Sequence, residues 1–272
     1  KSDGGYLYAT TDLAAARFRI TELNANRLIY VTDSRQRDHF GMVFQTLREA
    51  GWADDSVRLD FVPFGTVLGS DSKPFKTREG GTVKLTDLLD KAETLAAEII
   101  ARKDPELDAE QRAAVAHAVG IGALKYADLA TDRVKDYVFD WDRMLAFEGN
   151  TAPYLQNAYV RIRSIFRKGG IDPTTIDPTH IEVTDDAERA LALKLLELPS
   201  VVVSVADTLE PHRLCTYLYE SASAFHKFYE SCPVLNVEKA AQRNSRLALC
   251  DMTARTLKCG LALLGIDTVE RM

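Results

Sequence analysis

The sequence predicts a chain of two parts, an α/β part built on a parallel sheet and, after it, an all-α helical bundle. Three observations predict this. Before residue 64, short runs rich in β-branched and aromatic residues alternate with amphipathic stretches, an order typical of parallel strands joined by helices. From Leu85 onward the pattern is almost wholly helical. The two patterns meet near Gly149, so we expect domains at 1–150 and 151–272.

The α/β part is expected to alternate strands with helices. We expect strands at 6–10, 27–33 and 57–64 and helices at 12–21 and 37–50. The second helix has apolar side chains at helical spacing, namely Phe40, Val43, Phe44 and Leu47. Gly51 follows it, and a glycine in this place commonly ends a helix.

One helix of the stretch after Leu85 begins with a capping signal. Asp108 can accept the amide of Gln111, whose side chain can reach back, so a long helix is predicted over 109–136. Pro173 and Pro178 indicate an extended loop over 172–186. Three further helices are expected at about 185–206, 211–231 and 239–264.

Composition excludes several classes of protein. No stretch approaches the roughly 20 apolar residues that a membrane helix needs, and no secretory signal opens the chain. The four cysteines, at 215, 232, 250 and 259, form no CxxC pair. We therefore expect no metal site, and reduced, mostly buried thiols indicate the cytoplasm. The net charge of −6 argues against indiscriminate coating of nucleic acid but permits a specific RNA contact.

Four segments resemble arginyl-tRNA synthetases, in that family's order: residues 6–15, 73–85, 147–156 and 207–214. Residues 263–272 resemble the usual end of these enzymes. The resemblance implies a partial Rossmann-like parallel sheet, from the C-terminal part of a class I catalytic domain, followed by an all-helical, DALR-type anticodon-binding domain. It also implies that the intact enzyme, a monomer, activates arginine with ATP and Mg²⁺ and esterifies it to tRNA(Arg).

Tyr8 and Asp12 are predicted at the carboxyl end of the first strand, the edge of an α/β sheet where ligands bind. A carboxylate suits a guanidinium substrate. From the residues alone, Asp12 could instead cap its helix while Tyr8 packs in the core. The resemblance implies that Tyr8 and Asp12 contact the arginine side chain, that Gln36 lines the same pocket and that His39 lies near the nucleotide.

The loop at 73–78 corresponds by position to the KMSKS signature of class I synthetases. The resemblance implies that its cations stabilise charge on the phosphates of ATP, and they are Lys73, Lys76 and Arg78. The sequence at 73–78 is Lys-Pro-Phe-Lys-Thr-Arg, which leaves open which lysine contacts which phosphate. The alternative is a charged loop without a catalytic role. No histidine pair has HIGH spacing, so we expect a truncated piece that is inactive alone.

The helix expected over 149–168 has an apolar face, while its basic residues lie largely elsewhere. Aromatic, amide and guanidinium groups are the ones that bind unpaired bases and phosphates, and the candidates are Tyr154, Gln156, Asn157, Tyr159, Arg161, Arg163 and Arg167. We expect phosphate contacts from Arg163 and Arg167, with Arg243 and Arg246 as further basic positions, and base contacts from Gln156, Asn157 or Tyr159. Tyr154 and Tyr159 could also be core residues. Relatives often have Tyr where this chain has Asn157.

Two other functions stay open. A non-enzymatic RNA-binding module fits a chain in which only the RNA-reading part is whole. Cysteinyl-tRNA synthetases share the class I core, but they select substrate with a zinc–thiolate pocket that the cysteine spacing here does not offer.

Overall fold

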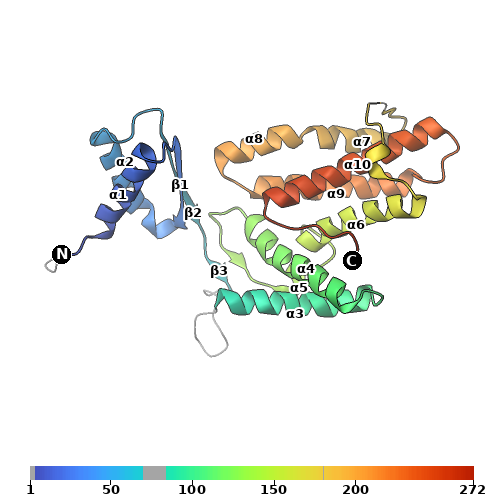
Figure 1. Cartoon of the computed structure of the whole chain (residues 1–272), viewed down its shortest axis with the longest axis horizontal. Helices are drawn as coiled ribbons and strands as arrows, with labels where there is room; N and C mark the ends of the chain where they lie inside the picture. The colour runs from blue at the N-terminus through green and yellow to red at the C-terminus, as the bar shows by residue number, and fades with distance from the viewer. Residues whose placement is uncertain (1–3, 70–83, 180) are drawn as a thin grey trace. The chain divides into compact units, whose positions relative to one another are not determined.

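The computed structural model describes residues 4–69, 84–179 and 181–272 (Figure 1). The chain forms two compact units. The first runs to Val67 and includes Arg133–Tyr137, and the second consists of Leu68–Asp132 and Val138–Met272. The domain limits 1–150 and 151–272 stay a prediction, because compactness alone does not define the ends of a domain.

The first unit is built on two parallel strands, β1 (Arg27–Asp33) and β2 (Arg58–Phe64). Helix α1 (Tyr8–Thr21) and helix α2 (Arg37–Glu49) pack against each other. The small apolar core consists of Ala16, Leu28, Val43, Leu47, Ala53 and Val57. The parallel α/β pattern predicted from the sequence is thereby confirmed.

The predicted strand at 6–10 is wrong, because α1 already begins at Tyr8. Leu7 is extended, and its carbonyl accepts hydrogen bonds from the amides of Thr10 and Thr11. The Thr11 hydroxyl also donates to the Tyr8 carbonyl, at 2.8 Å. The polar groups of this segment are thus satisfied within the first turn of the helix. The strand preference of aromatic residues depends on context and is overruled here.

Helix α2 ends as predicted. Its last residue is Glu49, and Gly51 adopts a φ of +68°. The amide of Gly51 donates to the Arg48 carbonyl, and the amide of Trp52 donates to the Leu47 carbonyl. A left-handed residue in this place is accessible to glycine at little cost.

The second unit is mainly helical (Figure 1). Helix α9 (His212–Ser231) packs most closely against helices α6 (Ala152–Gly169), α7 (Asp186–Leu196), α8 (Leu198–Thr208) and α10 (Ala240–Leu263). Two more long helices, α3 (Leu85–Lys103) and α4 (Ala109–Leu129), pack closely together, and α4 also contacts α6. The predicted bundle is confirmed, and none of the helices in the described ranges is long and apolar enough to span a membrane.

The short elements are β3 (Val67–Leu68), β4 (Tyr137–Val138), α5 (Trp141–Met144) and two 3₁₀ turns, η1 (Ser34–Gln36) and η2 (Pro173–Thr175). Strands β3 and β4 pair with each other. All four cysteines are free, and Cys259 alone is exposed.

Two helix limits differ from the prediction. Helix α4 ends at Leu129, seven residues before the predicted end at 136, because the following backbone bonds to another segment: Arg133 accepts from the amide of Gly65. The stretch predicted as one helix at 185–206 is divided into α7 and α8. Pro199 lies in the first turn of α8, where its missing N–H costs nothing, whereas inside one continuous helix it would break a hydrogen bond.

Candidate functional site

The first unit brings Asp12 and His39 together. Asp12 Oδ2, on α1, lies 2.7 Å from His39 Nε2, on α2, and both side chains are about one third exposed. The ring of His39 also meets Phe40 edge-on, with centroids 5.1 Å apart. Asp12 lies in the second turn of α1, whose N-cap is Leu7. The alternative that Asp12 caps its own helix is therefore wrong.

Tyr8 and Gln36 flank this pair without being buried. Tyr8 is 86% exposed, so it is not a core residue, and it lies one turn before Asp12 on the same face of α1. Gln36 is the N-cap residue of α2 and lines a hollow of 460 Å³ beside β1. Their assignment to arginine binding stays a prediction. Lys73, Lys76 and Arg78 lie outside the described residues.

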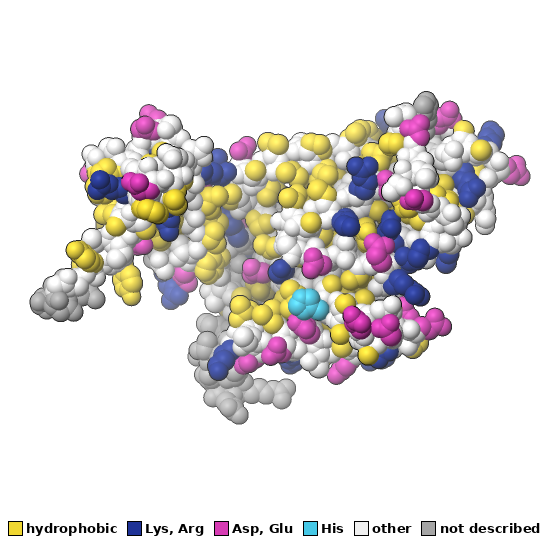
Figure 2. Space-filling view, viewed as in Figure 1, with side chains coloured by type: hydrophobic (Ala, Val, Ile, Leu, Met, Phe, Trp, Pro, Cys, Tyr) yellow, Lys and Arg dark blue, Asp and Glu magenta, His cyan; other side chains and the backbone are white. Residues whose placement is uncertain are grey.

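A basic pocket of 390 Å³ lies on the second unit. Helix α6 supplies most of its lining, and the remainder comes from α9, the last residues of the chain and Asp104 at the end of α3. Four cationic side chains line it against one carboxylate, Asp104, and they are Arg161, Arg167, Lys168 and Arg271. Figure 2 shows basic side chains gathered over the region where Figure 1 places α6 and the C-terminus. Such a lining favours an anionic ligand.

An aromatic platform stands in the pocket. The guanidinium of Arg161 lies over the ring of Tyr229, 5.8 Å from its centroid. Tyr229 is 40% exposed, and its ring is stacked on the fully buried Phe225 at 6.0 Å. Tyr229 is therefore supported from behind while part of its surface stays accessible. An exposed ring beside a guanidinium is the arrangement on which unpaired bases stack.

Tyr229 is absent from the residues predicted from the sequence. Phe225 and Tyr229 lie four residues apart on one face of α9, and this spacing does not separate one from the other. What distinguishes them is depth, since Phe225 is at 0% exposure, and depth is decided by the neighbouring helices.

Tyr154 contacts two residues of α9, His226 and Tyr219. Its hydroxyl is 2.8 Å from His226 Nδ1, and its ring lies 5.5 Å from that of Tyr219. Burial and the nearby charge of Arg161 lower the pKa of His226. Burial and the same Arg161 charge lower the pKa of Lys103 at the end of α3. In both groups burial is the larger cause and the charge of Arg161 the second.

Two of the predicted base-reading residues are inside the protein. Gln156 is fully buried, and its Nε2 donates to the carbonyls of Ala118 at 3.0 Å and Asp267 at 2.8 Å. Tyr159 is 3% exposed, and its hydroxyl donates to Glu270 Oε1 at 2.9 Å. Their burial disagrees with contact to a base. Asn157, by contrast, lines the basic pocket.

The predicted phosphate contacts also have partners within the protein. Arg163 Nε lies 2.8 Å from Glu270 Oε2, and Arg167 Nη1 donates to the Glu270 carbonyl at 2.8 Å. Arg246 is buried and lies 2.6 Å from Glu188 Oε1. Arg246 as a phosphate contact is therefore wrong, because its charge is already used in the interior.

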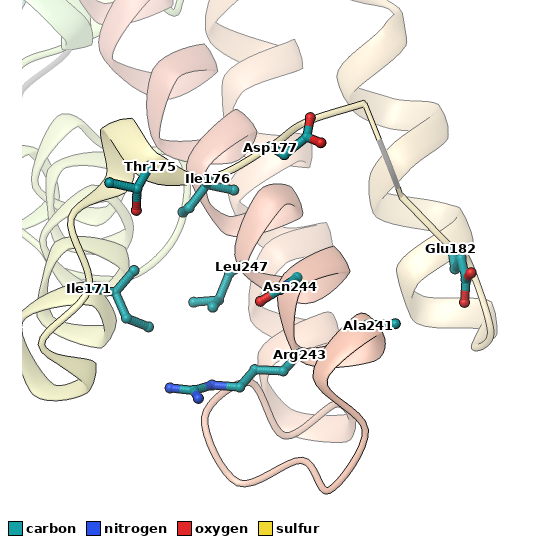
Figure 3. A pocket seen from close by; sticks show the side chains of 9 residues that line it. All are labelled: Ile171, Thr175, Ile176, Asp177, Glu182, Ala241, Arg243, Asn244 and Leu247. Atoms are coloured by element: carbon teal, nitrogen blue, oxygen red, sulfur yellow. The ribbon is translucent and has the colours of Figure 1, made fainter.

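A further cavity, of 480 Å³, lies between residues 171–182 and the start of α10. Figure 3 shows Arg243 reaching from α10 on the side of Ile171. The lining also carries two carboxylates, Asp177 and Glu182. This mixture of charge does not single out one class of ligand.

Comparison with known proteins finds one matching family for each of the two parts of the chain. Residues 1–141 match the family described as tRNA synthetases class I (R), catalytic domain, and residues 155–272 match the DALR anticodon binding domain. Over all 272 residues the chain is 54% identical to the arginine–tRNA ligase of Edwardsiella ictaluri and 52% identical to that of Salmonella typhimurium. It spans 47% of the length of each of these relatives.

Solved structures give the same result. The whole chain superposes on arginyl-tRNA synthetase from Plasmodium falciparum with a TM-score of 0.86 and 34% identity, covering 46% of that chain. On the Thermus thermophilus arginyl-tRNA synthetase the TM-score is 0.88 at 27% identity, and 50% of that chain is covered.

Proposed function

This chain belongs to the class I (R) tRNA synthetases, and we propose that its helical part holds the anticodon loop of an arginine tRNA. The observation that carries the proposal is the basic pocket with Arg161 over Tyr229. An anticodon loop presents unstacked bases joined by phosphates. Such a ligand needs an aromatic surface and cations next to each other, which this pocket supplies.

Each residue of the pocket has its own role in binding the loop. Tyr229 offers the stacking surface, Arg161 a cation against it, and Val160 an apolar wall. Asn157 offers both a donor and an acceptor for the edge of a base. Among the residues that line the pocket, Tyr229 carries the aromatic ring, so it is the group available for stacking with a base.

The whole enzyme is proposed to activate arginine with ATP and to esterify it to the 3′ end of tRNA(Arg). In this proposal the carboxylate of Asp12 pairs with the substrate guanidinium, and His39, 2.7 Å away, orients that carboxylate. Tyr8 and Gln36 complete the pocket. The two alternatives, a non-enzymatic RNA-binding module and a cysteinyl-tRNA synthetase, are not favoured, since the relatives along the whole chain are arginine–tRNA ligases.

Mg²⁺ is proposed to accompany ATP as a substrate complex. The described residues do not fit a resident metal site, because they include no group of three or more His, Cys, Asp or Glu side chains able to hold one. A cytoplasmic, monomeric enzyme with reduced cysteines belongs to the same proposal.

The test is a salt titration of a labelled arginine anticodon stem-loop against a stem-loop with a scrambled loop. We expect the chain to prefer the matched loop and to lose affinity as salt rises. Arg161→Ala should flatten the salt slope by about one unit if Arg161 contacts a phosphate. Equal binding of both RNAs by folded chain at every salt concentration would contradict the proposal.

A further inference from the structure

Residues 265–272, here named the closing segment, form one wall of the basic pocket. Helix α10 ends at Leu263, and the chain then turns at Gly265, whose φ is +68°. Arg271 and Met272 both line the pocket. The closing segment has no helix or strand to hold it, so its position depends on side-chain contacts.

Those contacts converge on Glu270. Its carboxylate accepts from the hydroxyl of Tyr159 at 2.9 Å and from Nε of Arg163 at 2.8 Å. Its backbone carbonyl accepts from Nη1 of Arg167 at 2.8 Å. The three donors are spaced four residues apart on α6, so they form one stripe along that helix.

Two further bonds hold the start of the closing segment. Gln156 donates to the Asp267 carbonyl at 2.8 Å, and Lys125 on α4 donates to the Gly265 carbonyl. These bonds hold the backbone at Gly265 and Asp267. Glu270, next to the pocket-lining Arg271, bonds to three side chains of α6.

The charge of Glu270 fits this task. Burial raises its pKa, but the hydrogen bonds from Arg163 and Tyr159 outweigh burial and leave the pKa below its ordinary value. The side chain is thus a carboxylate at neutral pH, and charge-assisted bonds are stronger than neutral ones. Protonation is not required for the contact.

We propose that Glu270 is a positioning residue of the RNA pocket, holding Arg271 and Met272 in the wall. Arg163 and Arg167 then act on RNA through Glu270 and not by binding phosphate themselves. This inference rests on the proposed anticodon-binding function. It differs from the sequence-based assignment of both arginines, whose donors point to the closing segment.

The direction in which RNA affinity changes when Glu270 is removed depends on the role of Glu270. Glu270 is an anion beside a basic pocket. If it only competed with RNA phosphates for Arg163, its removal would strengthen RNA binding. If it positions the wall, its removal weakens binding although the net charge becomes more favourable to RNA.

The experiment compares Glu270→Ala and Glu270→Gln in the full chain, with the anticodon stem-loop and its scrambled control as probes. We expect Glu270→Ala to lose about tenfold in affinity for the matched loop, the weight of one charge-assisted bond. Glu270→Gln keeps one of the two acceptor oxygens and should lose less. The matched control is Glu220→Ala, because Glu220 is similarly exposed and also pairs with a cation, Lys194, at 3.0 Å.

Hydrogen exchange supplies a second readout, since the amides of 265–272 should exchange faster in Glu270→Ala than in Glu220→Ala. If Glu270→Ala does not fold, Tyr159→Phe removes one of the contacts to the Glu270 carboxylate without changing the charge of the pocket. Wild-type preference for the matched loop with equal or tighter binding by folded Glu270→Ala overturns the positioning role alone. No wild-type preference at any salt concentration overturns the proposed function and, with it, the inference.

Discussion

Arg246 Nε lies 2.6 Å from Glu188 Oε1, and the side chains of the pair are 9% and 0% exposed. Glu188 also accepts from the amides of Thr184 and Asp185 and closes the capping box of α7. Arg246 donates to the Pro233 carbonyl as well. The pair therefore ties the start of α7 to α10, and its charges are compensated by further hydrogen bonds.

Removing one partner of this pair should be costly. We expect Arg246→Ala to lower the free energy of unfolding by about 3–5 kcal/mol, because Glu188 would be left as an uncompensated buried charge. Urea denaturation followed by circular dichroism measures the loss. Arg255→Ala is the control, because the Arg255 side chain is 74% exposed and its ion pair with Asp251 is long, at 3.9 Å. An equal decrease in the free energy of unfolding in both variants would show that the buried pair stabilises the protein no more than an exposed one.

The same pair should make stability depend on pH. Burial raises the pKa of Glu188, but hydrogen bonds from Thr184 and the pairing with Arg246 outweigh it, so the folded pKa lies below the ordinary 4.5. The contribution of Glu188 is then present above pH 4.5 and is lost as pH falls through the folded pKa. The stability difference between wild type and Glu188→Gln should shrink below pH 4.5. A difference that stays constant down to the folded pKa would contradict this.

Arginine binding should depend on Asp12. Asp12→Asn keeps the size of the side chain and removes its charge, so it should weaken arginine binding by about 1.5–3 kcal/mol, the range for a hydrogen bond to a charged group. Isothermal titration calorimetry of the full chain with arginine measures it. Asp33→Asn is the control, because Asp33 pairs with its neighbour Arg35 at the surface. Unchanged affinity in Asp12→Asn would place the guanidinium elsewhere.

The ring of Tyr229 should matter more than its hydroxyl. Tyr229→Ala should cost about 1–3 kcal/mol in binding of the anticodon stem-loop, the range for stacking of one base. Tyr229→Phe keeps the ring and its contact with Phe225, so it should bind like wild type. The salt slope should stay unchanged in both, since no phosphate contact is lost. If Tyr229→Ala and Tyr229→Phe bind the stem-loop equally, the ring of Tyr229 is not a stacking surface for a base.

Two helical glycines should respond to alanine in opposite directions. A Cβ at Gly120 would lie 2.7 Å from backbone atoms of Ala92, where α3 and α4 meet. Gly120→Ala should therefore destabilise the protein by about 1–3 kcal/mol through overpacking. Gly41, within α2, has no atom within 4 Å of such a Cβ, and Gly41→Ala should stabilise by up to about 1 kcal/mol. Thermal melts of both variants compare the signs, and a stabilising Gly120→Ala would contradict the close packing.

The sequence by itself determined what depends on near neighbours. The Asp108 carboxylate accepts from the Gln111 amide, and Gly51 ends α2, because both devices act over three or four residues. Strands β1 and β2 were likewise predictable, since two apolar runs separated by one helix favour parallel pairing. Arg161 was named from its local pattern and lines the pocket.

The tertiary structure decided which polar side chains stay available. Gln156 meets Asp267 across 111 residues, Arg163 meets Glu270 across 107, and Arg246 meets Glu188 across 58. Helical periodicity places these side chains on a face but cannot say which acid or carbonyl will reach that face. A buried polar group must find a partner wherever the fold brings one. Arg163, Arg167 and Arg246, which local pattern assigned to RNA, therefore bond to acids or carbonyls of the chain itself, while Arg161 and Tyr229 face the pocket.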